Sequence, residues 1–121
     1  MGVLAIVGIV KNEPKVDAKG QFECYGTRHF APGARVYVLP PEPSYDMGSG
    51  RVRVLGFHRE TGEVTKIWFR IVRASQWKVE IVDDPEICSY WSGEWTPSEA
   101  KGLAKFFAQE SQDRPEVDRG K

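Results

Sequence analysis

The 121-residue sequence predicts one mainly β domain, a small barrel or curved antiparallel sheet of about five strands with a single C-terminal helix. Its composition, 40% hydrophobic and 12% aromatic, is typical of a folded chain rather than a disordered one. Short runs rich in β-branched residues, separated by Gly and Pro, recur through the first two thirds of the chain. A helix-capping motif followed by an apolar stripe at helical spacing stands near the C-terminus.

The first predicted strand is the run Val3 to Val10, VLAIVGIV. It shows no alternation of apolar and polar residues, so we expect a strand covered on both faces. The run is too short to cross a bilayer, and it lacks the basic start and small-residue cleavage site of a secretion signal. The sequence therefore predicts a cytoplasmic protein without a membrane partner.

The second predicted strand, Arg35 to Leu39, alternates, with Val36 and Val38 inward and Tyr37 outward. The segment Pro40 to Gly50 contains three prolines and two glycines and is expected to be a long connection, since proline cannot donate to a sheet ladder.

The strongest pattern is Arg51 to Val72, which predicts a β-hairpin closed by a Thr61-Gly62 turn. This turn would determine which residues lie opposite each other in the hairpin and which side chains share a face. The expected inner pairs are Val52 with Ile71, Val54 with Phe69 and Gly56 with Ile67. The expected outer pairs are Arg53 with Arg70, Leu55 with Trp68 and Phe57 with Lys66.

A further strand is predicted at Trp77 to Val82, which alternates again. A three-residue turn, Ala74 to Gln76, would pair it with the second hairpin strand and place Phe69 opposite Ile81. Asp83-Asp84-Pro85 should end this strand as a solvated acidic turn.

The C-terminal helix is predicted from Pro97 to about Glu110. Thr96-Pro97-Ser98-Glu99 forms a capping box with proline at the first helical position. An apolar stripe follows at Ala100, Leu103, Ala104 and Phe107. The domain would then cover residues 1–111, with 112–121 as a frayed, charged tail.

The order strand, loop, strand, hairpin, strand resembles the small five-stranded barrels of the Src-homology-3 and KOW type. The residues that carry the resemblance are Phe30-x-x-Gly33-x-x-Val36-x-Val38, followed by Gly50-x-Val52-x-Val54, within residues 30–82. The resemblance implies a binding module for a protein or a nucleic acid. The loop after Leu39 is longer than the short turn of a KOW unit.

Charge is unevenly distributed although the net charge is zero. Residues 51–78 hold seven Lys/Arg and two Asp/Glu, and residues 79–121 hold five against ten. Two interpretations of the outer hairpin face follow. An anionic partner could neutralise the arginines and stack on the aromatic rings. Alternatively, the C-terminal helix could cover the face while a carboxylate from the acidic segment Asp83 to Glu99 pairs with Arg53 or Arg70.

The cysteines and histidines of the sequence show no spacing typical of a catalytic or metal site. Cys24, Cys88, His29 and His58 could supply zinc ligands, but only Cys24 and His29 are near each other in sequence. Two distant cysteines fit a reducing compartment as well as one optional disulfide. We expect no cofactor and no catalytic residues, although a small enzyme remains an alternative.

The sequence thus predicts a non-catalytic domain that binds another macromolecule. A protein partner is expected first, as in bacterial adaptor or immunity-type proteins, and a nucleic acid is the alternative. The oligomeric state is open. The candidate binding residues are Tyr37, Tyr45, Arg51, Arg53, Phe57, Lys66, Trp68, Arg70, Trp91 and Trp95.

Overall fold

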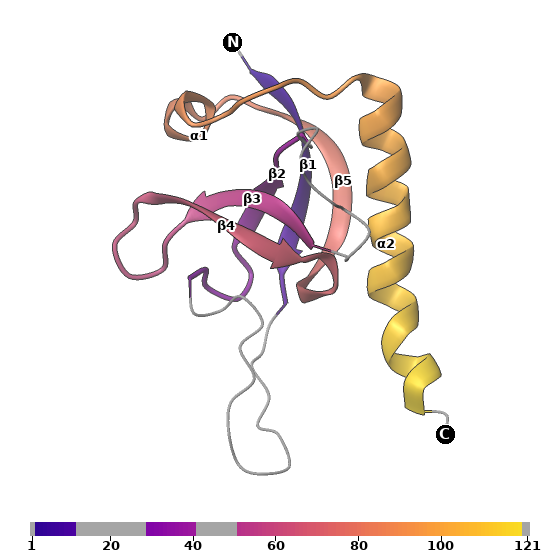
Figure 1. Ribbon diagram of the computed structural model, residues 1–121. Helices are drawn as coiled ribbons and strands as arrows, with labels where there is room; N and C mark the ends of the chain where they lie inside the picture. The colour runs from indigo at the N-terminus through magenta and orange to yellow at the C-terminus, as the bar shows by residue number, and fades with distance from the viewer. Residues whose placement is uncertain (1, 12–28, 41–50, 120–121) are drawn as a thin grey trace.

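The computed structural model describes residues 2–11, 29–40 and 51–119, with the side chains of the last segment described as far as Gln109 (Figure 1). Five antiparallel strands form one sheet in the order β4-β3-β2-β1-β5. The strands are β1 (Val3–Val10), β2 (Arg35–Val38), β3 (Arg51–Phe57), β4 (Val64–Arg70) and β5 (Ala74–Val82). A 3-10 helix, η2 (Ile71–Arg73), precedes β5, and two α-helices, α1 (Pro85–Ser89) and α2 (Pro97–Arg119), follow it.

The predicted fold class is confirmed as a mainly β chain with an antiparallel sheet and a long helix near the C-terminus. The sheet is open, because β4 and β5 form its two edges and do not pair with each other. Of the two predicted architectures, the open sheet is therefore the correct one and the closed barrel is not.

Strand β1 lies inside the sheet between β2 and β5 and is covered on both faces, as its unbroken apolar run predicted. Ile6 and Val10 belong to a core cluster on the inner face, and Ala5 and Val7 belong to a second cluster on the outer face. The same eight residues therefore supply both layers of the domain.

The predicted pairing of the fifth strand with the hairpin is wrong. Residues 71–73 form η2 instead of extending β4, and β5 crosses to pair with β1. The β1–β5 ladder contains an irregularity between Val7 and Ile9, and Gln76 nearby has a φ of 60°. The shift is typical of a β-bulge, in which one residue leaves the regular pairing. Ile81, predicted to be in the core, is 61% exposed as a result of this placement.

The hairpin register is shifted by two residues from the prediction, because the connection is longer than the Thr61-Gly62 turn. The His58 amide donates to the Glu63 carbonyl at 2.9 Å and the Gly62 amide to the His58 carbonyl at 2.8 Å. Residues 59–62 thus form a four-residue loop, with Gly62 at a φ of 76°. A shift of two keeps every side chain on its predicted face but changes its partner.

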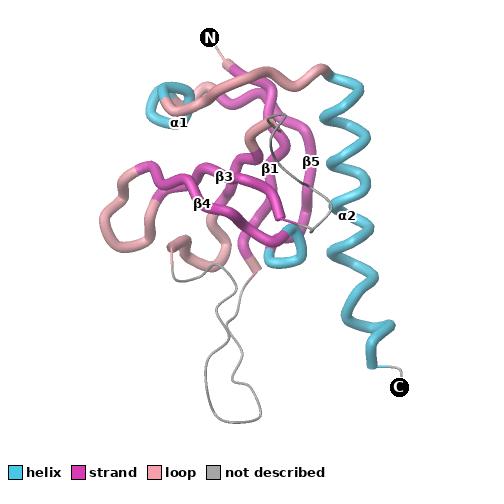
Figure 2. Tube along the Cα trace, in the orientation of Figure 1, coloured by secondary structure: helices cyan, strands magenta, loops and turns pink. Residues whose placement is uncertain are grey.

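The inner face of the sheet carries the main core, and α2 packs against it alongside β5 (Figure 2). The buried members of this cluster from the strands include Val36, Val38, Val52, Val54 and Phe69, as predicted. The helix contributes its expected stripe, with Ala100, Ala104 and Phe107 buried and Leu103 partly buried. The expectation that α2 covers the outer hairpin face is therefore wrong.

The segment that covers part of the outer face is α1 and the chain around it. Ile87 of α1 is fully buried against Ala5, Val7 and Leu55 in the second cluster. The Asp84 carboxylate begins this short helix by accepting from the amides of Glu86 and Ile87 at 2.9 and 3.3 Å. The predicted acidic turn is thus a helix cap.

Helix α2 begins at the predicted residue, where the Glu99 amide donates to the Thr96 hydroxyl at 3.2 Å. It continues to Arg119, past the predicted end near Glu110 and through the segment predicted to fray. The prediction stopped where the apolar stripe ends, whereas the helix continues through a polar segment that includes Pro115.

Candidate functional site

The hairpin register places four cations and one tryptophan on the outer face of β3 and β4. Arg51 lies opposite Arg70, Arg53 opposite Trp68, and Lys66 opposite Leu55. Residues directly opposite in an antiparallel pair project to the same side of the sheet. We call this set, Arg51, Arg53, Lys66, Trp68 and Arg70, the basic face.

Most of the basic face is open to solvent. Arg51, Lys66 and Arg70 are exposed, Trp68 is 50% exposed, and Arg53 is half-buried. Strand β4 is an edge of the sheet, so no further strand extends the surface beyond Trp68 and its two flanking cations. The arrangement can present positive charge and an aromatic ring together to a partner.

The predicted pair of Arg53 with Arg70 is wrong, and a different pair of arginines lies opposed in the hairpin. Arg53 opposes Trp68 rather than Arg70, and the two opposed arginines are Arg51 and Arg70. Like charges directly opposite each other in a ladder destabilise it. Among the residues that the structure describes, no carboxylate forms an ion pair with Arg51 or Arg70.

The predicted cover of Trp68 is wrong, since this ring is 50% exposed. An internal carboxylate partner for Arg53 stays a prediction. Two carboxylates of the acidic segment Asp83 to Glu99 act locally at helix starts: Asp84 caps α1, and a Glu99 oxygen accepts weakly from the Thr96 amide at 3.5 Å. Arg51, Arg70 and Trp68 are exposed together, so these three residues form a candidate surface for an anionic partner.

Several other predicted binding residues belong to the core instead. Tyr37 is buried in the second cluster, and Phe57 packs against that cluster. Trp95 is buried and its indole Nε1 donates to the Val38 carbonyl at 3.0 Å, while Trp91 is half-buried and packs against both clusters. Tyr45 lies outside the described residues, as does the rest of segment 41–50.

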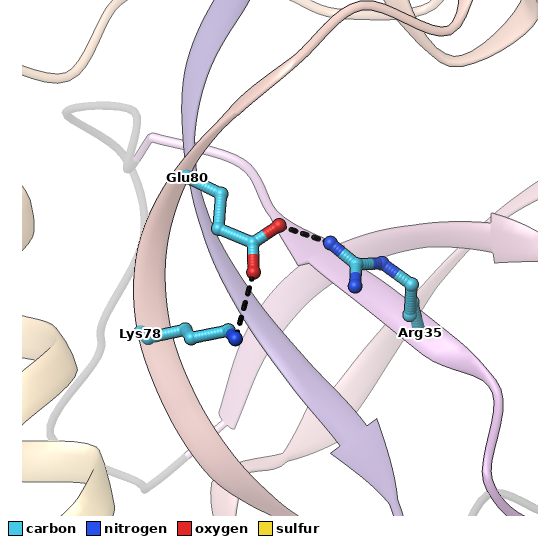
Figure 3. A network of polar contacts seen from close by, with 3 residues as sticks. All are labelled: Arg35, Lys78 and Glu80. Atoms are coloured by element: carbon cyan, nitrogen blue, oxygen red, sulfur yellow. Dashed lines mark hydrogen bonds and ion pairs between the residues drawn. The ribbon is translucent and has the colours of Figure 1, made fainter.

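A second polar cluster, which the sequence analysis did not single out, lies on β2 and β5 (Figure 3). The Glu80 carboxylate lies between two cations, pairing with the Arg35 guanidinium and with Lys78 Nζ at 3.1 Å. Hydrogen bonding to Tyr37 and Glu80 outweighs the effect of burial and raises the pKa of Arg35. Burial opposes ionisation of Glu80, but hydrogen bonds from Lys78 and Arg35 outweigh it and lower the pKa of Glu80. In the sequence, the alternation Lys78-x-Glu80 was the signal from which this polar cluster could have been predicted.

Within the part of the chain whose side chains are described, three more large apolar side chains are exposed: Tyr90, Ile81 and Phe106. Tyr90 follows α1 as its C-cap and is 59% exposed. None of the three belongs to the strands that carry the basic face. Substitutions at these residues can therefore serve as controls for substitutions on the basic face.

The two histidines are neighbours, as their rings lie 5.8 Å apart in an edge-to-face arrangement. The Glu60 amide donates to His58 Nδ1 at 3.1 Å, which gives that imidazole a role in the hairpin loop. Within the described segments, no three His, Cys, Asp or Glu side chains come together in a way that could hold a metal ion. Cys24, a ligand considered for zinc, lies outside those segments.

No helix in the described part of the chain combines the length and the apolar composition needed to cross a membrane. Comparison with known protein families, with characterised proteins and with solved structures finds no match to this chain.

Proposed function

We propose that this chain is a non-catalytic, cytoplasmic binding domain that takes a nucleic acid on the basic face. The observation that carries the proposal is the opposition of two exposed arginines, Arg51 and Arg70, beside the half-exposed ring of Trp68.

Both features of the basic face are unfavourable when nothing is bound. Opposed like charges weaken a strand pair, and an exposed indole leaves apolar area in water. Both costs fall when a phosphate backbone lies against the guanidiniums and a base covers the ring. A chain of zero net charge that gathers cations on one strand pair has the electrostatic pattern of such a surface.

A nucleic acid is preferred over the protein partner expected first. The protein interpretation assumed a covered hairpin face and left the Trp91/Trp95 segment and the Pro40 to Gly50 loop to bind a partner; residues 41–50 of that loop lie outside the described residues. Instead Trp95 is buried with its N–H satisfied and Trp91 packs on the core, whereas the basic face is open. A partner protein with an acidic surface is the competing outcome of the experiment below.

The resemblance to Src-homology-3 and KOW barrels belongs to the same proposal. The succession β2, β3, β4 and β5 along the chain supports it. The open sheet departs from it, so the ligand is argued from the basic face alone.

The test uses one substitution that should move stability and binding in opposite directions. Arg70→Glu places a carboxylate opposite Arg51, so the free energy of unfolding should rise by about 0.2–1 kcal/mol. The same change should abolish binding of a labelled mixed-sequence oligonucleotide. With three exposed cations engaged, the wild-type affinity for a single strand should fall with salt at a log–log slope of about −2.

The matched control is Lys101→Glu, an exposed cation of α2 far along the chain from the hairpin. It should leave oligonucleotide affinity nearly unchanged. Equal losses at both positions, or an affinity that does not depend on salt, would contradict a site on the basic face. Binding of polyglutamate as tight as that of the oligonucleotide would identify an acidic protein as the partner class.

A further inference from the structure

The outer side of β4 carries an alternation of cation, aromatic ring and cation. Lys66, Trp68 and Arg70 occur at every second residue, so they project from the same side of the strand about 7 Å apart. Lys66 and Arg70 are exposed, and Trp68 between them is half exposed. The strand thus offers one stacking surface with a positive charge on each side.

We propose that the strand β4 binds single-stranded rather than duplex nucleic acid, with one unpaired base stacked on Trp68 and the flanking phosphates on Lys66 and Arg70. This inference rests on the proposed function and adds the form of the nucleic acid. It commits the ring to a specific role: contact with the face of a base.

The first argument for a single strand is the position of Trp68. A base offers its flat face to a protein ring only when it is unpaired and unstacked, since in a duplex both faces are covered by neighbouring base pairs. An indole that is half exposed on an edge strand between two cations can meet such a base. It reaches nothing equivalent on the outside of a duplex.

The second argument is the shape of the support. A two-stranded ribbon can enter the major groove of a duplex. The β3–β4 hairpin is not a free ribbon, because β3 also pairs with β2 through Tyr37 and Leu55. The outer layer formed by α1 lies over that side of the sheet, with Ile87 packed in one cluster with both residues. The accessible part is therefore the edge, along which a flexible single strand can lie.

The third argument is the second row of charge on β3. Arg51 lies opposite Arg70, and Arg53 lies opposite Trp68 with its side chain half-buried. Directly opposed residues are about 5 Å apart. A nucleic-acid strand that lies along β4 therefore stays near the cations of both β-strands. Its phosphates would reduce the repulsion between Arg51 and Arg70.

The experiment measures affinity by fluorescence anisotropy with three labelled probes of equal length. They are a single-stranded oligothymidylate of ~12 nucleotides, within the range of known single-strand site sizes, its duplex with oligoadenylate, and a strand with the same backbone but abasic sugars. The abasic strand keeps the phosphate charge and removes the stacking group. Variants are checked for folding by thermal denaturation before titration.

We expect the oligothymidylate to bind more tightly than either other probe. Trp68→Ala should weaken binding of the oligothymidylate by about 5- to 150-fold, the loss of one stacked base, and leave binding of the abasic strand unchanged. Trp68→Phe should restore part of the loss. The control Tyr90→Ala removes a ring of similar exposure outside the basic face and should change nothing.

Each remaining outcome is decisive. If the duplex binds as tightly as the single strand, or if Trp68→Ala weakens the abasic strand equally, stacking on Trp68 is refuted. Loss of affinity in Arg70→Glu would still support the proposed function in that case. If none of the three probes binds the wild type, the proposed function and the inference about single strands both fail.

Discussion

Replacing Gly8 by alanine should destabilise the domain, because the ring of Trp77 occupies the space that a methyl group would need. A Cβ built on Gly8 would lie 2.5, 2.6 and 2.9 Å from three atoms of that ring. Carbon atoms in favourable contact are about 3.5–4.0 Å apart. The indole would therefore have to move by about 1 Å to relieve the overlap.

Trp77 has little room to move. It is 5% exposed, and its ring packs edge-to-face on Phe107 of α2 with centroids 5.2 Å apart. Overpacking of a core typically costs about 1–3 kcal/mol, and weakening the aromatic pair adds about 0.5–1.5 kcal/mol. We expect Gly8→Ala to lower the free energy of unfolding by about 2 kcal/mol.

Gly102→Ala is the matched control, with the same chemical change and the opposite expected sign. Gly102 is exposed in α2, and a Cβ there would meet no atom within 4 Å. Alanine favours helix over glycine by about 1 kcal/mol, so this variant should be more stable than the wild type.

Urea unfolding followed by far-UV circular dichroism measures both variants under the same conditions. A double-mutant cycle with Trp77→Phe isolates the contact, since a smaller ring should tolerate the new methyl group. If Gly8→Ala is as stable as the wild type, or if Trp77→Phe does not reduce its cost, the packing of this ring on β1 is wrong.

Three further predictions concern single interactions. Trp95→Phe removes the indole donor to the buried Val38 carbonyl and should cost about 1–3 kcal/mol by urea unfolding; no loss would refute that hydrogen bond. Thr96→Ala removes the hydroxyl that accepts from the Glu99 amide and should cost about 1 kcal/mol, whereas Thr96→Ser should cost less. The pKa of Glu80 is lowered in the folded state, so its carboxylate stabilises the fold above the usual carboxyl pKa, and this contribution is lost as the pH falls through the lowered value. Glu80→Gln should therefore lower stability by less than about 1 kcal/mol at neutral pH and have no effect in acid; a difference that persists in acid would contradict the ion pairs of this carboxylate.

Much of the fold could be predicted because local patterns determine it. The alternation in the hairpin assigned Val54 and Phe69 to the inner face and Trp68 to the outer face, and a two-residue shift of register leaves those assignments intact. The cap at Thr96 marked the start of α2 correctly. The register itself was missed, because Gly62 ends a four-residue loop and local turn chemistry suited a shorter turn equally well.

What could not be predicted depended on contacts between distant parts of the chain. The alternation of β5 shows that it is a strand but carries no information about whether β1 or β4 is its neighbour. The burial of two candidate binding residues could not be predicted for the same reason. Tyr37 and Trp95 have binding-type side chains, and only the position of the segment around α1 shows that both are buried. Lys66, Trp68 and Arg70 are exposed because an edge strand has little to cover them.

The central place of β1 has a consequence for how the chain reaches this fold. This eight-residue strand pairs on one side with β2 and on the other with β5, a strand that is made only after β2, β3 and β4. Until residues 74–82 have left the ribosome, one edge of the most apolar strand has no partner. Closing so long a loop is slow, and an unpaired apolar strand edge promotes aggregation. We therefore expect slow refolding in vitro, with the highest tendency to aggregate before the β1–β5 ladder forms.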